Sequence, residues 1–181
     1  EDRARPEGRQ LRLAVAVLAP AGPDPRPDPV VRIPGGPGGD AVAGAPADLQ
    51  RWPFLEDRAL VLYDPRGTGH SDPRICPELS REWFVVTYGG GLSAEERSAR
   101  ERAVLADCRA EIDEEGIDLA RYTTRDNALD LDDIRRALGY EEWNLHGISY
   151  GSRVALEAAR STPAGIRSVI LGAPYPPNAP G

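Results

Sequence analysis

The chain has 181 residues, with 22 Lys or Arg, 29 Asp or Glu and a formal net charge of −7, a length that suits one domain with a buried core. Its isoelectric point of about 4.9 argues against nucleic acid or an anionic membrane as the main partner. No apolar run approaches the roughly 18 residues of a membrane-spanning helix.

Two residue types are missing, and Cys occurs only twice. There is no Met, so we expect a processed product or a fragment, and all 22 basic residues are Arg, which we attribute to coding composition. The two cysteines, Cys76 and Cys108, fit either one disulfide in an oxidising compartment or two buried free thiols.

The first third of the chain predicts strands separated by Pro- and Gly-rich connections. Residues 11–18 and 30–33 are expected to be strands, and the proline-rich stretch 20–29 between them is expected to be a surface connection. A short helix is predicted over 47–55. The uninterrupted apolar run 59–63 is typical of a strand buried on both faces.

Two amphipathic helices are predicted next. Ser93-Ala-Glu-Glu96 is a capping box for a helix to about Glu115, ending at Gly116. Its apolar face is expected to carry Val104, Cys108 and Ile112. A second helix should run from a cap at Thr124 through Leu138 and stop at Gly139. The apolar side predicted for this helix is Ala128, Leu131, Ile134 and Leu138.

The last part predicts a strand over 143–146, a helix over 150–161 closed by Pro163, and a strand over 167–171. Buried strands that alternate with helices indicate an α/β protein with a mainly parallel sheet and flanking helices.

Gly147-Ile-Ser149-Tyr-Gly151 lies between a predicted strand and a predicted helix. A tight turn there would lift the Ser149 hydroxyl above the sheet edge, and the glycines would prevent clashes with neighbouring backbone. The helix N-terminus would stabilise a developing oxyanion. This context favours Ser149 as a nucleophile, and the alternative is a chance G-x-S-x-G in a turn.

The glycine-rich loop Gly35–Gly39 follows the strand over 30–33. Acyl transfer needs two backbone N–H donors, one from the residue after the serine and one from a loop after an earlier strand. We therefore predict Tyr150 and Gly36 as these donors. A plain turn is one alternative, and a phosphate loop is another, but the chain contains no Gly-Lys-Ser/Thr.

The segment Asp64-Pro-Arg-Gly-Thr-Gly-His70-Ser71 directly follows the buried strand over 59–63. We expect Asp64 to pair with Arg66 and fix this turn, in a structural role.

These motifs resemble the α/β-hydrolase family of proline iminopeptidases and secreted tripeptidyl aminopeptidases. The matching segments are P-G-G-P-G-G, D-P-R-G-T-G-H-S, Y-T-T-R-D-N-A-L-D-L-D-D-I-R-R-A-L-G and N-L-H-G-I-S-Y-G-S-R. The resemblance implies an α/β-hydrolase fold and a serine peptidase acting on peptide N-termini. Ser149 would be its nucleophile, with Gly36 and Tyr150 as oxyanion donors. Pro34, in place of the His usual in iminopeptidases, is closer to the tripeptidyl aminopeptidases.

The resemblance also implies a Cys76–Cys108 disulfide and a secreted, extracellular protein. Closing that 33-residue loop would contribute about 3–4 kcal/mol through loop-closure entropy. No metal or organic cofactor is implied, because acyl transfer by serine requires none and neither cysteine has a His at ligand spacing.

A serine hydrolase also needs a histidine base and an acid. After Ser149 the only acidic residue is Glu157, and there is no His. His146 lies at the entry to the turn and cannot reach the Ser149 hydroxyl, and His70 is expected to pack or bond locally. Family members place a cap after the last strand, then the acid and the His. We therefore expect residues 1–181 to be the N-terminal part of one catalytic domain that ends where a cap would begin.

Two other functions remain open at this stage. An esterase of the same fold would cleave acyl esters instead of peptides, and a non-catalytic protein would keep the turn only as scaffold. In the leading hypothesis, the missing acid and His come from a C-terminal companion segment, and this chain alone is inactive.

Overall fold

The computed structural model describes residues 1–43, 52–176 and 178. The helix predicted over 47–55 lies partly outside the described residues, and Pro53–Glu56 form a short 3-10 turn instead. The described chain forms two compact units, one from residues 1–72 and 120–181 and the other from residues 73–119.

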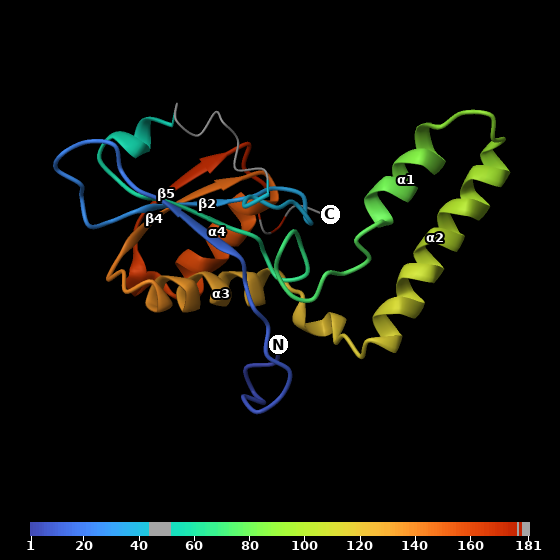
Figure 1. The fold of residues 1–181 in the computed structure, drawn as a ribbon, viewed down its shortest axis with the longest axis horizontal. Coiled ribbons are helices and arrows are strands. Elements are labelled where there is room, and N and C mark those ends of the chain that lie inside the picture. The colour runs from blue at the N-terminus through green and yellow to red at the C-terminus, as the bar shows by residue number, and fades with distance from the viewer. Residues whose placement is uncertain (44–51, 177, 179–181) are drawn as a thin grey trace. The chain divides into compact units, whose positions relative to one another are not determined.

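The larger unit contains a five-stranded sheet in the order β1-β3-β2-β4-β5 (Figure 1). Strand β1 runs antiparallel to β3, and the other neighbours are parallel, as the sequence predicts. Every strand expected from the sequence is present, although the first begins four residues later than predicted. The strands are β1 (Val15–Leu18), β2 (Val30–Ile33), β3 (Leu60–Tyr63), β4 (Trp143–Ile148) and β5 (Ile166–Gly172).

Helices α3 (Thr124–Ala137) and α4 (Tyr150–Ser161) pack on one face of this sheet (Figure 1). The predicted apolar residues Ala128, Leu131 and Ile134 of α3 are buried there. The prediction for Leu138 is wrong, because it is the C-terminal cap and is 37% exposed. The cap at the other end is Thr123, one residue before the predicted position.

Arg66 does not pair with Asp64, contrary to the sequence-based expectation. Its guanidinium donates from Nε and Nη2 to the two carboxylate oxygens of Asp130 on α3, at 2.7 and 2.6 Å. Both partners are buried, and a third guanidinium nitrogen donates to the carbonyl oxygen of Arg121 at 2.6 Å. Planar guanidinium and carboxylate groups match in such a two-bond contact, so this pair ties the turn after β3 to helix α3.

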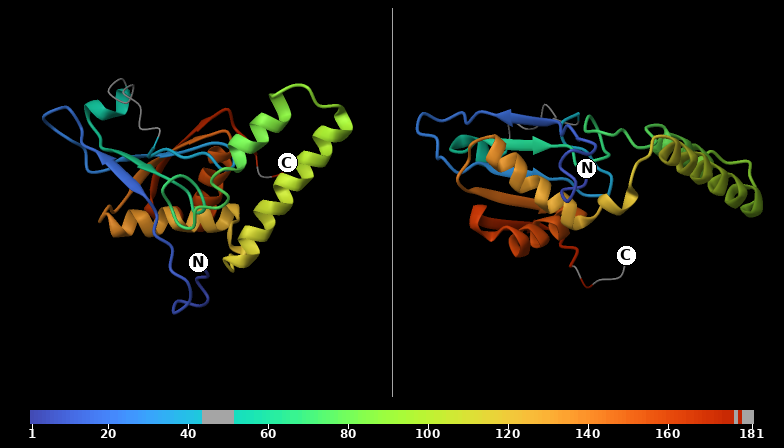
Figure 2. Two further views of the ribbon diagram at one scale, coloured as in Figure 1. Left: turned by 45° about the vertical axis from the view of Figure 1, so that its right-hand side comes forward. Right: turned by 90° about the horizontal axis from the view of Figure 1, so that it is seen from below.

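The smaller unit is a hairpin of two helices, α1 (Leu79–Tyr88) and α2 (Ala94–Glu114), which Figures 1 and 2 show side by side. Helix α2 is confirmed, with the capping box between Ser93 and Glu96 formed as predicted. Helix α1 is not predicted, because aromatic and β-branched residues fill its second half and are typical of strands.

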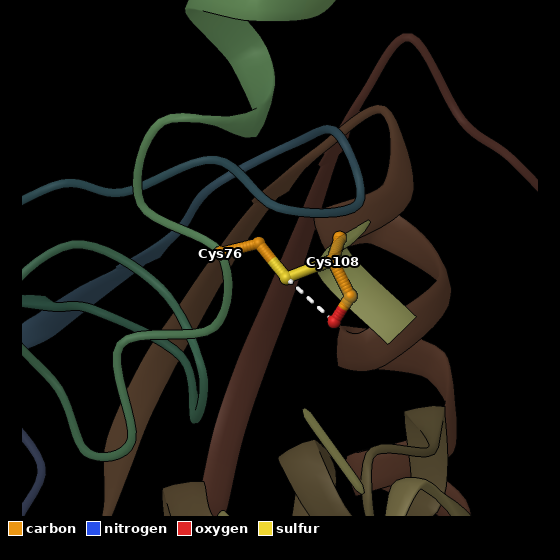
Figure 3. Close-up of a disulfide and its surroundings, with 2 residues drawn as sticks. All are labelled: Cys76 and Cys108. Atoms are coloured by element: carbon orange, nitrogen blue, oxygen red, sulfur yellow. Dashed lines mark hydrogen bonds between the residues drawn. A yellow bond between two sulfur atoms is a disulfide. The ribbon is translucent and has the colours of Figure 1, made fainter. Parts of the chain in front are cut away.

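A disulfide joins Cys76, just before α1, to Cys108 on α2, with the Cα atoms 5.5 Å apart (Figure 3). The pairing that the resemblance implied is therefore present. Besides Cys76, the buried apolar side chains of this hairpin are Val86, Ile112 and Ile117. So small a core cannot contribute much to stability, and units of this size often depend on a covalent link.

We expect the hairpin to lose its structure when the disulfide is removed. Replacing both Cys76 and Cys108 by Ser should destabilise it by about 3–4 kcal/mol, because the unfolded chain regains the entropy of an open loop. Hydrogen exchange should then accelerate in residues 79–114 and remain slow in β3 and α3. Equal protection of α2 with and without the disulfide would contradict this expectation.

The Arg66–Asp130 pair should matter far more for stability than an exposed pair of the same geometry. Asp130→Ala leaves the buried guanidinium uncompensated and should lower the free energy of unfolding by about 3–5 kcal/mol. Arg109 and Asp113 on α2 make the same two-bond contact, but both side chains are more than half exposed. Asp113→Ala is the matched control and should leave urea unfolding nearly unchanged. Equal effects of the two substitutions would show that burial is not the cause.

Candidate active site

Ser149 forms the turn between strand β4 and helix α4. Its backbone has φ 52° and ψ −122°, outside the regions that L-residues with a side chain usually adopt. Its N–H donates to the carbonyl oxygen of Gly172 at the end of β5, at 2.9 Å. A serine held in such a conformation at a strand-to-helix turn has the geometry of a nucleophile elbow.

Packing of backbone against backbone explains the two glycines of the motif. A Cβ at Gly147 would lie 2.7 Å from the carbonyl carbon of Gly151 and 2.8 Å from the Cα of Ser152. A Cβ at Gly151 would lie 2.6 Å from the carbonyl oxygen of Pro34. These gaps are too small for any side chain, so the turn can form only with glycine at both positions.

The structure brings the glycine-rich loop and Ser149 together. A Cβ at Gly35 would lie 3.2 Å from the Cβ of Ser149 and 3.7 Å from its Oγ, so the loop backbone is next to the hydroxyl. The N–H of Gly39 donates to the carbonyl oxygen of Gly35 at 3.2 Å and closes the loop. Gly36 has φ 119°, which requires glycine.

Tyr150, the other predicted donor, is the first residue of α4. Its N–H is at the very start of the helix, where the backbone has no carbonyl one turn earlier within that helix to accept it, and the helix dipole there favours an anion next to Ser149. The phenol hydroxyl of Tyr150 lies 3.0 Å from the Oγ of Thr124 at the start of α3. Its ring packs against the core between sheet and helices, which fixes the start of α4.

Asp64 organises the loops beside this site. One carboxylate oxygen accepts from the N–H groups of Ala41 and Val42 at 2.8 and 2.7 Å, and the other accepts from the N–H of His70 at 2.9 Å. Burial acts to raise the pKa of the Asp64 carboxyl. The N–H groups outweigh burial and hold that pKa below its ordinary value of 3.8. Since Ala41 follows the glycine-rich loop closely, Asp64 helps to hold that loop in place.

Neither histidine has the setting of a catalytic base. His70 bonds locally, as expected: its side chain is 64% exposed, with Nδ1 3.5 Å from a carboxylate oxygen of Asp64. His146 packs edge-on against the rings of Trp52 and Phe54, with centroids 5.3 and 5.8 Å away. Burial, and then the charge of Arg32, lower the pKa of His146.

Two residues that the sequence did not single out also contact the turn. The buried Ser152 hydroxyl bonds to the carbonyl oxygen of Ser149, and the N–H of Tyr175 bonds to the same hydroxyl. Ser152 directly follows the G-x-S-x-G motif, so its place in the sequence already indicated that it lies close to the Ser149 turn. Tyr175 is 23 residues further along the chain, and nothing in its neighbourhood in the sequence indicated the contact.

Within residues 1–43, 52–176 and 178, no group of three or more His, Cys, Asp or Glu is arranged to hold a metal ion. In the same part of the chain, no helix combines the length and apolar character needed to span a bilayer.

Known proteins with similar sequences include peptidases. The chain is 31% identical to a tripeptidyl aminopeptidase of Streptomyces lividans over 177 residues, covering 94% of this chain and 33% of the relative. It is 33% identical to the serine protease Hip1 of Mycobacterium tuberculosis, covering 98% of this chain and 35% of that protein. The chain therefore spans about a third of the length of these relatives.

Solved structures show the same fold. A proline iminopeptidase of Mycobacterium smegmatis superposes with a TM-score of 0.53 at 20% identity, covering 87% of this chain and 38% of that one. A marine microorganism esterase superposes with a TM-score of 0.52 at 14% identity. The match covers 90% of this chain and 41% of the esterase chain.

Because the folded protein holds the pKa of Asp64 below 3.8, its carboxylate stabilises the fold above that pH. This contribution is lost as the pH falls through the lowered pKa. Asp64→Asn places an NH₂ group against backbone N–H donors, so it should cost about 1–3 kcal/mol at pH 7. That cost should shrink in urea unfolding below about pH 3.8, near the ordinary pKa of Asp. Asp72→Asn, at a partly exposed carboxylate in the same turn, is the control and should cost less. A cost for Asp64→Asn that does not change with pH would contradict the assignment.

The family described as the alpha/beta hydrolase fold matches residues 28–181. This match agrees with the mostly parallel sheet, the turn at Ser149 and the relatives above. The chain belongs to the alpha/beta hydrolase fold family.

Proposed function

We propose that Ser149 is the nucleophile of a serine aminopeptidase that releases amino acids or short peptides from peptide N-termini. The observation that carries this proposal is the turn itself: Ser149 at φ 52°, with the glycine-rich loop against its side chain. The similarity to tripeptidyl aminopeptidase and to the Hip1 protease favours a peptide substrate over an ester.

In this reaction the Ser149 Oγ attacks the carbonyl carbon of the scissile peptide bond, and its proton passes to a base. The carbonyl oxygen becomes an oxyanion that accepts hydrogen bonds from the N–H groups of Tyr150 and Gly36. Collapse of this intermediate breaks the C–N bond, and the amine leaves with the proton. Water then hydrolyses the acyl-enzyme and regenerates the Ser149 hydroxyl.

The base and the acid that orients it are assigned to sequence outside these 181 residues. His70 and His146 are the only histidines of the chain. His70 lies next to Asp64 in a loop, and His146 packs edge-on against the rings of Trp52 and Phe54. Residues 1–181 would then supply the nucleophile and the oxyanion donors, and a companion segment would supply the acid and the His.

The disulfide also supports secretion. Disulfides persist in oxidising compartments and are rare in the reducing cytosol. We therefore propose that the Cys76–Cys108 link reflects an extracellular protein.

Ser149→Ala should abolish activity in the longest natural form of the protein that carries these residues. We expect the rate of tripeptidyl-arylamide cleavage to fall by several orders of magnitude, because no other group can form the acyl-enzyme. A fluorophosphonate probe should label wild-type protein at Ser149 and leave the variant unlabelled. Ser168→Ala, on strand β5, is the matched control and should keep both properties.

Three outcomes would contradict the proposal in different ways. Arylamide cleavage by the Ser149→Ala variant at a rate close to that of wild type would refute the assignment of Ser149 as nucleophile. Turnover of short acyl esters without turnover of arylamides would make the protein an esterase. Absence of labelling in a preparation that contains the companion segment would make it a non-catalytic member of the family.

A further inference from the structure

The Ser152 hydroxyl connects the nucleophile turn to the segment after strand β5. Ser152 is fully buried, and its Oγ lies 2.5 Å from the carbonyl oxygen of Ser149 and 2.7 Å from the backbone nitrogen of Tyr175. A carbonyl oxygen can only accept and a backbone N–H can only donate. The directions are therefore fixed: Tyr175 N–H donates to Ser152 Oγ, and the Ser152 hydroxyl donates to the Ser149 carbonyl.

The carbonyl of Ser149 and the N–H of Tyr150 belong to one peptide unit. That unit is planar and trans, so its C=O and N–H point in nearly opposite directions. The backbone N–H of Ser152 also donates to the Ser149 carbonyl oxygen, at 2.9 Å. Two donors from one residue thus set the direction of the carbonyl, and the planarity of the unit then sets the direction of the Tyr150 N–H.

The last residue of β5 and the segment that follows it hold Ser149 at its N–H and at its carbonyl. The N–H of Ser149 donates to the carbonyl oxygen of Gly172 at 2.9 Å, and the carbonyl of Ser149 is linked through Ser152 to Tyr175. The Tyr175 ring also lies over the guanidinium of Arg153, 4.8 Å from its central carbon. Residues 172–175 are therefore bound to the turn at several points.

We propose that Ser152 is a positioning residue that aims the N–H of Tyr150 at the oxyanion of the reaction. Hydrogen bonds in a chain polarise one another, so the bond to the Ser149 carbonyl also strengthens the Tyr150 N–H as a donor. This role rests on the proposed function. It acts where charge develops in the transition state, so it affects kcat more than KM.

A purely structural role for Ser152 would have different consequences from the positioning role. A serine inside a helix often bonds back to a carbonyl one turn earlier with no consequence beyond local geometry. In that case the loss of the hydroxyl would lower stability but leave the rate constant of each correctly folded site unchanged. The kinetic constants of titrated active sites separate the two roles.

The test compares Ser152→Ala, Ser152→Thr and Ser161→Ala in the longest natural form of the protein. Ser161 is the matched control, because it is on the same helix and its hydroxyl also makes a short bond, 2.8 Å to Glu157. We expect Ser152→Ala to lower kcat for tripeptidyl arylamides about tenfold, the value of one hydrogen bond in the transition state, with KM nearly unchanged. Ser152→Thr keeps a hydroxyl and should recover most of the rate, and Ser161→Ala should match wild type.

Hydrogen exchange at the Tyr175 amide gives a second readout that needs no activity. It should be about tenfold faster in Ser152→Ala, in which the acceptor is gone, and unchanged in Ser161→Ala. An unchanged kcat, or an unchanged Tyr175 exchange rate, in Ser152→Ala would overturn the proposal. If wild-type Ser149 does not react with a fluorophosphonate, the proposed function fails, and with it the catalytic role of Ser152. The exchange rates then still decide whether Ser152 couples the two segments.

Discussion

The backbone packing around Ser149 is the constraint on which the rest of the site depends. Ser149 can remain at φ 52° only because β4, the start of α4 and the end of β2 approach one another without side chains between them. Gly147 and Gly151 allow this approach, because a Cβ at either position would overlap neighbouring backbone. A strained residue persists when its surroundings hold it in place. Here backbone hydrogen bonds at both the N–H and the carbonyl of Ser149 do so.

Two buried carboxylates then place the loops around this turn. The Asp64 carboxylate accepts hydrogen bonds from the backbone N–H groups of Ala41, Val42 and His70, so it fixes the path of the chain after the glycine-rich loop. Asp130 on α3 accepts two hydrogen bonds from the guanidinium of Arg66. This pair attaches the turn after β3 to α3. Helix α3 in turn contacts the hydroxyl of Tyr150 through Thr124. The candidate oxyanion donors are thus held by groups from several strands and helices, as a preorganised site requires.

The sequence predicted the features that local patterns specify. The buried residues Ala128, Leu131 and Ile134 of α3, the capping box at Ser93, the apolar run of β3 and the strand-to-helix turn at Ser149 each depend on residues close together in the chain. Each of these structural features is confirmed. Arg66 was assigned to Asp64 because that carboxylate is two positions away, yet its partner is Asp130, 64 residues later. Helix α1 was missed because its residues Trp83–Tyr88 favour a strand by intrinsic preference, and the hairpin overrides that preference. Contacts between distant segments, such as Ser152 with Tyr175, carry no local pattern at all.

The site also shows why a candidate nucleophile can be recognised although the described residues place no candidate base beside it. The glycine-rich loop follows β2, and Ser149 and the start of α4 follow β4. Strands β2 and β4 are parallel neighbours in the sheet. The carboxyl ends of parallel neighbours meet at one edge, so these parts assemble as soon as the sheet forms. A general base needs only to reach the Oγ by one hydrogen bond and imposes no such backbone constraint. The backbone that would hold an oxyanion is therefore part of the described core. A base that takes the proton of the Ser149 hydroxyl can come from a separate part of the sequence without changing that geometry.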